Sequence, residues 1–99
     1  MLSGKNRSYL KGLAHSMDPV VNIGKEEVTE NVMLELDRTL EARELIKVKI
    51  QDGCMLDPKR LANILAEDLN AEFVQAIGKK FVLYRKSENK PKIELPYRK

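Results

Sequence analysis

The sequence has few of the residues from which catalytic and metal sites are commonly built. Its single cysteine, Cys54, cannot form an internal disulfide, and we expect it to be a bystander thiol in a loop. His15 is the only histidine, so a metal site would need it to converge with carboxylates without help from thiolates. A hydrolase-type site is severely limited for the same reason, because it needs a nucleophile, an orienting base and an oxyanion donor. There is also no glycine-rich nucleotide loop, so we predict no enzyme activity, no metal and no cofactor.

Long apolar runs are also absent, which argues against a membrane span, and the first residues lack the apolar stretch of a secretory signal. We therefore expect a cytoplasmic protein. The 99 residues are 42% hydrophobic and 33% charged, with the apolar residues spread between charged ones. This composition is typical of a globular chain, and the length suits one domain, residues 1–99, which we expect to be monomeric.

Charge is distributed unevenly along the chain, although the net charge is only +3. Residues 1–25 carry four basic and one acidic side chain, residues 26–57 carry four and nine, and residues 58–99 carry ten and five. The two ends are therefore basic and the middle is acidic. If the ends meet in space, they form one basic face suited to an anionic partner.

The first half of the chain predicts a helix, a strand and a second helix. Apolar residues at spacings of three and four, with Ser3 as a cap, predict a helix over 3–16 that is broken at Asp18-Pro19. Residues 20–23 are rich in β-branched side chains and predict a strand ending at Gly24. Apolar residues every four positions predict a helix over 28–42, with Thr29 as a plausible N-cap.

The second half predicts a strand, a helix and a hairpin. Residues 45–50 predict a half-buried strand, because Ile46, Val48 and Ile50 alternate with Lys47 and Lys49 and so share one face. Asp57 and Pro58 are suited to starting the next helix, and Gly78-Lys79 suits a type II′ turn between strands 73–77 and 81–85. Residues 86–99 form a basic, proline-punctuated tail from which Ile93 and Leu95 are able to dock.

These elements predict an α/β domain with the order αβαβαββ. Helical connections favour parallel pairing of successive strands, whereas the final hairpin is antiparallel. We therefore expect a four-stranded mixed sheet with helices packed on it. The order of the strands within the sheet stays open.

Two basic blocks are the candidates for binding a polyanion. Lys5, Arg7 and Lys11 crowd one helix, where like charges repel without an anion. The second block, Lys79, Lys80, Arg85 and Lys86, surrounds Phe81 and Tyr84. Basic residues interleaved with aromatics suit backbone tracking and base stacking, with Phe81 the better core residue and Tyr84 the better stacking candidate.

Two further features allow both a structural and a binding interpretation. His15, near the end of the first helix, either caps or packs that helix, or it contacts RNA. Gly24-Lys25 lies where a strand passes into a helix, which is a position that either turns the chain or holds a phosphate. The carboxylates of residues 28–42, among them Glu30, Glu35, Asp37 and Glu41, are expected on a solvated helix face.

Four blocks of the sequence, in this order and spacing, resemble the YhbY family of stand-alone CRM domains, named for chloroplast RNA splicing and ribosome maturation. The blocks are residues 10–15 (LKGLAH), 19–25 (PVVNIGK), 44–50 (ELIKVKI) and 75–85 (QAIGKKFVLYR). The resemblance implies a fold similar to the C-terminal domain of translation initiation factor three. It also implies association with precursors of the large ribosomal subunit and their rRNA. In that family a G-x-x-G loop follows the first strand, whereas this chain has Gly24-Lys25-Glu26-Glu27, with carboxylates that repel RNA.

We therefore predict an RNA-binding ribosome-assembly factor that recognises RNA by shape and charge. The alternative is a protein-interaction module in which the acidic helix 28–42 docks a basic ribosomal protein. The residues predicted to bind RNA are Lys5, Arg7, Lys11, His15, Gly24, Lys25, Lys79, Lys80, Tyr84 and Arg85.

Overall fold

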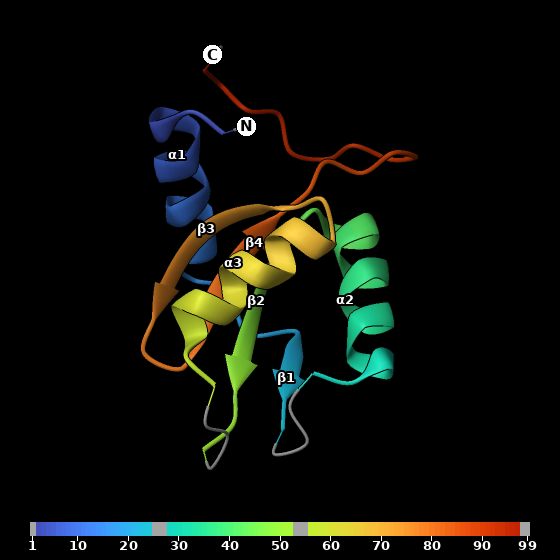
Figure 1. Cartoon of the computed structure of the whole chain (residues 1–99). Coiled ribbons are helices and arrows are strands. Elements are labelled where there is room, and N and C mark those ends of the chain that lie inside the picture. The colour runs from blue at the N-terminus through green and yellow to red at the C-terminus, as the bar shows by residue number, and fades with distance from the viewer. Residues whose placement is uncertain (1, 25–27, 53–55, 98–99) are drawn as a thin grey trace.

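Helices and strands follow one another in the predicted order in the computed structural model, which describes residues 2–24, 28–52 and 56–97 (Figure 1). Lys25, the residues Glu26-Glu27 and Cys54 lie outside the described residues. The elements are α1 (Gly4–Ala14), β1 (Val21–Ile23), α2 (Glu30–Arg43), β2 (Leu45–Ile50), α3 (Pro58–Asp68), β3 (Glu72–Ile77) and β4 (Lys80–Tyr84).

Each helix begins at a side chain that caps it. Ser3, Thr29 and Asp57 each accept a hydrogen bond from the backbone N–H three residues along, at 3.1 to 3.2 Å. These bonds satisfy donors that the first helical turn leaves without a partner. Pro58 occupies the first turn of α3, where its missing N–H costs nothing. All three predicted caps are confirmed.

The strands form one mixed sheet in the order β1-β2-β4-β3 (Figure 1). β1 runs parallel to β2, whereas β4 runs antiparallel to both β2 and β3. The predicted pairings of β1 with β2 and of β3 with β4 are confirmed. The expected parallel pairing of β2 with β3 was wrong, because β4 lies between these two strands. Gly78 has a φ of 59° at the hairpin turn. A positive φ at this position is the reason glycine was expected there. A register shift on β3 between Phe73 and Gln75 places Gln75 opposite Val82.

A hydrophobic cluster lies on each face of the sheet. The first joins α2 and α3 to the inward side chains of β2, namely Ile46, Val48 and Ile50. The second joins α1 to the opposite face. Leu45 of β2 belongs to it, because successive side chains of a strand point to opposite faces of the sheet. On α1, Leu10 is buried in the second cluster, whereas the neighbouring Tyr9 is exposed. Phe81 is fully buried in the first cluster, as predicted.

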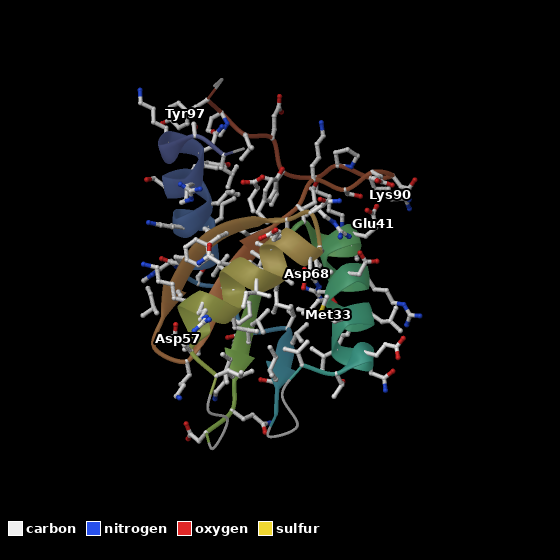
Figure 2. The ribbon with its side chains drawn as sticks, viewed as in Figure 1. Met33, Glu41, Asp57, Asp68, Lys90 and Tyr97 are labelled. Carbon is white, nitrogen blue, oxygen red and sulfur yellow. The ribbon has the colours of Figure 1, made fainter. Side chains whose placement is uncertain are left out.

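The C-terminal tail folds back against the second cluster and the end of α2. Ile93 and Leu95 pack on this cluster, which confirms the predicted docking. Glu41 accepts hydrogen bonds from the Oγ of Ser87 at 2.6 Å and from the next two backbone N–H groups. Figure 2 shows Glu41 at the end of α2 beside the tail that carries Lys90. Glu41 was expected on a solvated helix face, and it is half-exposed, but its carboxylate also holds the tail.

Glu44, at the end of α2, holds the tail at two further points. Its fully buried carboxylate accepts the backbone N–H of Ser87 at 2.8 Å on one oxygen. The other oxygen accepts the N–H groups of Lys92 and Ile93 at 2.7 and 2.6 Å. The tail is thereby fixed to the domain over much of its length. Among the described residues, no helix is long and apolar enough to cross a bilayer.

Candidate nucleic-acid interface

Helix α1 covers only part of its face of the sheet, and lysines occupy the rest. Alternation along β2 puts Lys47 and Lys49 on this face, opposite to the apolar residues between them. Lys80 of β4 joins them, since it pairs with Lys49 across the two strands. We call this open area the lysine face and define it by Asn22, Lys47, Lys49, Gln75, Ile77, Lys80 and the adjoining His15.

The lysine face concentrates positive charge that the described part of the chain does not neutralise. Lys49 and Lys80 lie directly opposite each other, an arrangement that destabilises a sheet when the charges are alike. Neither of them, nor Lys47, forms an ion pair with a described carboxylate, and the ion pair the structure does show joins Arg85 to Asp37. An anion bound here would remove this repulsion.

A small hollow of about 140 Å³ lies within the lysine face. It is lined by His15, Lys47, Gln75, Ile77, Lys80 and Val82. Ile77 is 67% exposed, so an apolar side chain stands among cations and amides at the surface. Apolar contact, hydrogen-bonding groups and positive charge at one place suit a ligand with flat apolar faces and an anionic backbone.

Basic residues on α1 extend this surface along the edge of the sheet. Arg7, Lys11 and His15 recur every four residues and so lie in one row on the helix. The Nε of Arg7 donates to the carbonyl oxygen of Phe73 on the edge strand β3 at 3.0 Å. This bond anchors the row beside β3, and its other end reaches the hollow at His15.

The carboxyl ends of β1 and β2 lie at the same end of the sheet as the β3–β4 turn (Figure 1). The backbone N–H of Ile50 donates to the carbonyl of Lys79 at 2.7 Å, which ties the turn to β2. A Cβ on Gly24 would lie 3.3 Å from the Oε1 of Gln51, so glycine permits a close approach there. The fold thus brings Gly24, Lys79 and Lys80 to one end, as the predicted site requires.

Tyr84 is excluded from the interface, contrary to the sequence-based prediction. Its side chain is 5% exposed and packs in the second cluster. It belongs to β4, whose two faces are both covered by the hydrophobic clusters. Burial raises the pKa of the Tyr84 phenol above its usual value, and the nearby negative charge of Glu44 raises it further. A ring in this position cannot stack on a base without opening the core.

Arg85 is also withdrawn from the predicted site. Its Nη1 donates to the Oδ1 of Asp37 at 2.8 Å and to the carbonyl of Leu69 at 3.0 Å. Its Nη2 donates to the Asp37 carbonyl at 2.9 Å. The guanidinium therefore joins α2 to the end of α3, and the same bonds use one carboxylate of the acidic helix.

Lys5 lies apart from the lysine face. Its Nζ is 5.7 Å from the centroid of the Tyr97 ring, next to the start of α1 (Figure 2). The predicted set is thus divided. Arg7, Lys11, His15, Gly24, Lys79 and Lys80 lie on or beside one surface, whereas Lys5, Tyr84 and Arg85 lie elsewhere and Lys25 lies outside the described residues.

The prediction missed Lys47 and Lys49, which lie at the centre of the lysine face. Their signal was the alternation of residues 45–50, which placed two lysines together on the face of the strand away from the first core cluster. Counting charges over three segments of the chain obscured this signal, because both lysines belong to the acidic segment 26–57. Among the described residues, no group of three His, Cys, Asp or Glu side chains is arranged to hold a metal ion.

Comparisons with known proteins identify the family of this chain. The CRS1 / YhbY (CRM) domain matches residues 2–85. The chain is 38% identical to a Bacillus subtilis protein named "Probable RNA-binding protein YqeI", covering 97% of this chain and 100% of the relative. It is 42% identical to a Haemophilus influenzae protein named "RNA-binding protein", covering 96% and 95%.

A solved structure shares the fold. The solution structure of a Staphylococcus aureus protein is 47% identical and superposes with a TM-score of 0.81, covering 97% of this chain and 100% of that one. The helices, the mixed sheet and their order are therefore those of a known small α/β domain. The family model matches most of the chain, and the two relatives are covered over nearly their whole length. The chain therefore belongs to the CRS1/YhbY family of CRM domains.

Proposed function

We propose that this chain binds RNA through the lysine face and the row of basic residues on α1. The observation that carries the proposal is the opposition of Lys49 and Lys80 on an open sheet face, with no described carboxylate paired to either. When lysines neutralise phosphates, the counterions that were bound to the RNA are released. This release supplies a large part of the affinity of proteins for nucleic acids. The names of the relatives in Bacillus subtilis and Haemophilus influenzae support the same function.

Recognition would proceed by shape and charge. Lys47, Lys49 and Lys80 neutralise phosphates across the sheet, while the hollow at His15 receives part of one nucleotide. Gly24, just after β1, lies at the same end of the sheet as the turn that carries Lys79, and it has no side chain to keep an RNA backbone away. No step in this account needs a cofactor or bond making and breaking.

The RNA we propose is that of the large ribosomal subunit precursor, in the cytoplasm, which makes the chain an assembly factor. The resemblance to the YhbY family supports this choice. The rival function, docking of a basic protein on α2, is weakened because Asp37 and Glu41 already bond within the chain. Cosedimentation of the tagged protein with ribosomal particles from a lysate tests the cellular partner.

Replacement of Lys49 and Lys80 by glutamine tests the binding surface directly. Binding of deproteinised ribosomal RNA, followed by fluorescence anisotropy over a range of salt concentrations, should weaken for the double variant. The slope of log affinity against log salt should fall by about 0.7 to 0.9 for each phosphate that the variant no longer neutralises. Lys11→Glu and Lys79→Glu should weaken binding to many RNA sequences alike, because phosphate contacts carry no sequence information.

A matched control comes from the other side of the sheet. Lys59 is exposed on α3, which packs on the face opposite to the lysine face. Lys59→Gln removes one charge, as the single variant Lys49→Gln does, but it should leave the affinity and the salt slope nearly unchanged, whereas Lys49→Gln should lower both. Equal losses for Lys59→Gln and Lys49→Gln would show that net charge alone governs binding, and the proposed surface would be abandoned.

A further inference from the structure

Two exposed tyrosines and a lysine border a second hollow, at the start of α1. Its volume is about 450 Å³, and it is lined by Gly4, Lys5, Ser8, Tyr9 and Tyr97. Tyr9 is 39% and Tyr97 47% exposed, so both rings present apolar surface to solvent. We call this site the tyrosine hollow. No carboxylate is among its lining residues in the described part of the chain.

The tail places Tyr97 at this hollow through its backbone. The side-chain amide of Asn6 donates to the Tyr97 carbonyl at 2.7 Å and accepts the Tyr97 N–H at 3.1 Å. Asn6 is itself buried, so both of these bonds are shielded from water. The paired bonds fix the backbone of Tyr97 against α1 and leave its ring at the surface (Figure 2).

The chemistry of the tyrosine hollow suits an unpaired nucleobase. Exposed aromatic rings stack on the face of any base, and a neighbouring cation contacts the phosphate of the same nucleotide. Lys5 supplies that cation, since its Nζ is 5.7 Å from the Tyr97 ring centroid. A cation–π contact this exposed is weak, so an entering base is able to displace the ammonium onto its own phosphate.

The tyrosine hollow is separate from the lysine face. Tyr9 follows Arg7 by two residues, which is about 200° around a helix, so the two side chains lie on different sides of α1. A base bound here would therefore add to the contacts of the lysine face and replace none of them.

We propose that the tyrosine hollow binds an unpaired base of single-stranded RNA by stacking on Tyr9 and Tyr97, with Lys5 on its phosphate. This inference rests on the proposed function, since it assumes that the ligand is RNA. It adds that the RNA has an accessible single-stranded nucleotide, because the bases of a duplex cannot reach the rings.

The test compares a short single-stranded RNA with a strand of equal length whose bases are replaced by abasic sites. Binding of both to the full chain is measured by fluorescence anisotropy. Tyr9→Ala with Tyr97→Ala should weaken binding of the intact strand by roughly tenfold or more and leave the abasic strand unchanged. Tyr9→Phe with Tyr97→Phe, which keeps the rings, should bind within about twofold of the native chain.

These substitutions leave the architecture in place, because Asn6 bonds to the backbone of Tyr97 and Tyr9 is exposed. Circular dichroism and thermal unfolding verify this for each variant. Native-like affinity of the double alanine variant for the intact strand overturns the stacking site, and so does equal affinity of the native chain for both strands. In both cases RNA binding itself stands, whereas failure of the native chain to bind either strand overturns the proposed function as well.

Discussion

Glu44 has both a strained backbone and a buried, charged side chain. Its backbone has a φ of 67° and a ψ of −50°, a strained positive-φ conformation close to that of a γ-turn, which costs an L-residue about 1–3 kcal/mol. Its side chain is fully buried, where an ionised carboxylate needs several hydrogen bonds. The three N–H groups of the tail supply those bonds and offset both costs.

Substitution of Glu44 separates the two demands. Glu44→Ala removes the acceptor and keeps the backbone strain, so it should lower the free energy of unfolding by about 3 kcal/mol. Glu44→Gly removes the same acceptor and relaxes the strain, so it should be more stable than the alanine variant by about 1 kcal/mol. Urea unfolding followed by circular dichroism measures both. An alanine variant as stable as the glycine variant would show that the positive-φ backbone at residue 44 carries no strain.

Residue-level reasoning from the sequence succeeded where the relevant partner lies nearby in the chain. The caps Ser3, Thr29 and Asp57 bond three residues along, so their motifs are visible in the sequence. It missed the contacts of Arg85 with Asp37 and of Glu41 with Ser87, which join residues more than 40 positions apart. Such pairings depend on how the tail and the helices close over the sheet, which local patterns do not encode.

The C-terminal tail is an element held by carboxylates, so its attachment depends on pH. Hydrogen bonds from the Ser87 hydroxyl and from the N–H groups of Glu88 and Asn89 lower the pKa of Glu41 below 4.5. Burial alone would raise the pKa of Glu44, but the N–H groups of Ser87, Ile93 and Lys92 outweigh it and lower that pKa as well. Both groups therefore bind the tail in their ionised form.

Acid should release the tail. A carboxylate whose pKa is lower in the folded state stabilises that state fully above its ordinary pKa of 4.5, and the contribution is lost as pH falls through the lowered value. Hydrogen exchange at the Ser87, Lys92 and Ile93 amides should accelerate below about pH 4.5, after correction for intrinsic rates, while amides in β2 and β4 stay protected. Glu44→Gln should show rapid exchange at neutral pH, and tail protection that is independent of pH would contradict this account.

The order of the strands was not predicted, although β4 carries a signal for its central place. Residues 81–84 form a continuous apolar run, and all four side chains are buried because clusters cover both faces of the strand. A strand buried on both sides has this pattern, whereas β3 at the edge is interrupted by Gln75 and ends at exposed Ile77. The run identifies a central strand only once the second face is known to be covered, which depends on α1 and the tail.

On the scale of the whole molecule, the lysine face is assembled across several strands and not from one basic stretch of the chain. The basic ends were predicted to meet on one surface, and the His15 end of the row on α1 does share a hollow with Lys80. The centre of that surface, however, comes from Lys47 and Lys49 in the acidic middle of the sequence. Only the register of β2 against β4 shows that lysines distant in sequence are neighbours.

This arrangement predicts a conflict between stability and binding. Lys80→Glu converts the repulsion with Lys49 into attraction and should raise the free energy of unfolding by about 0.2–1 kcal/mol. The same change should weaken RNA binding more than the neutral Lys80→Gln does, because a carboxylate repels phosphate. Added salt should shrink the stability gain, since screening weakens interactions between exposed charges.

A double-mutant cycle isolates the pair responsible. Lys49→Glu should resemble Lys80→Glu in both stability and binding, whereas the double glutamate variant restores repulsion between like charges and should lose the stability gain. Thermal unfolding and RNA titration of the same four proteins measure the two effects together. If both single variants are less stable than the native chain, the cross-strand repulsion is not a cost of the folded state, and the case for these lysines as an anion-binding pair loses its physical basis.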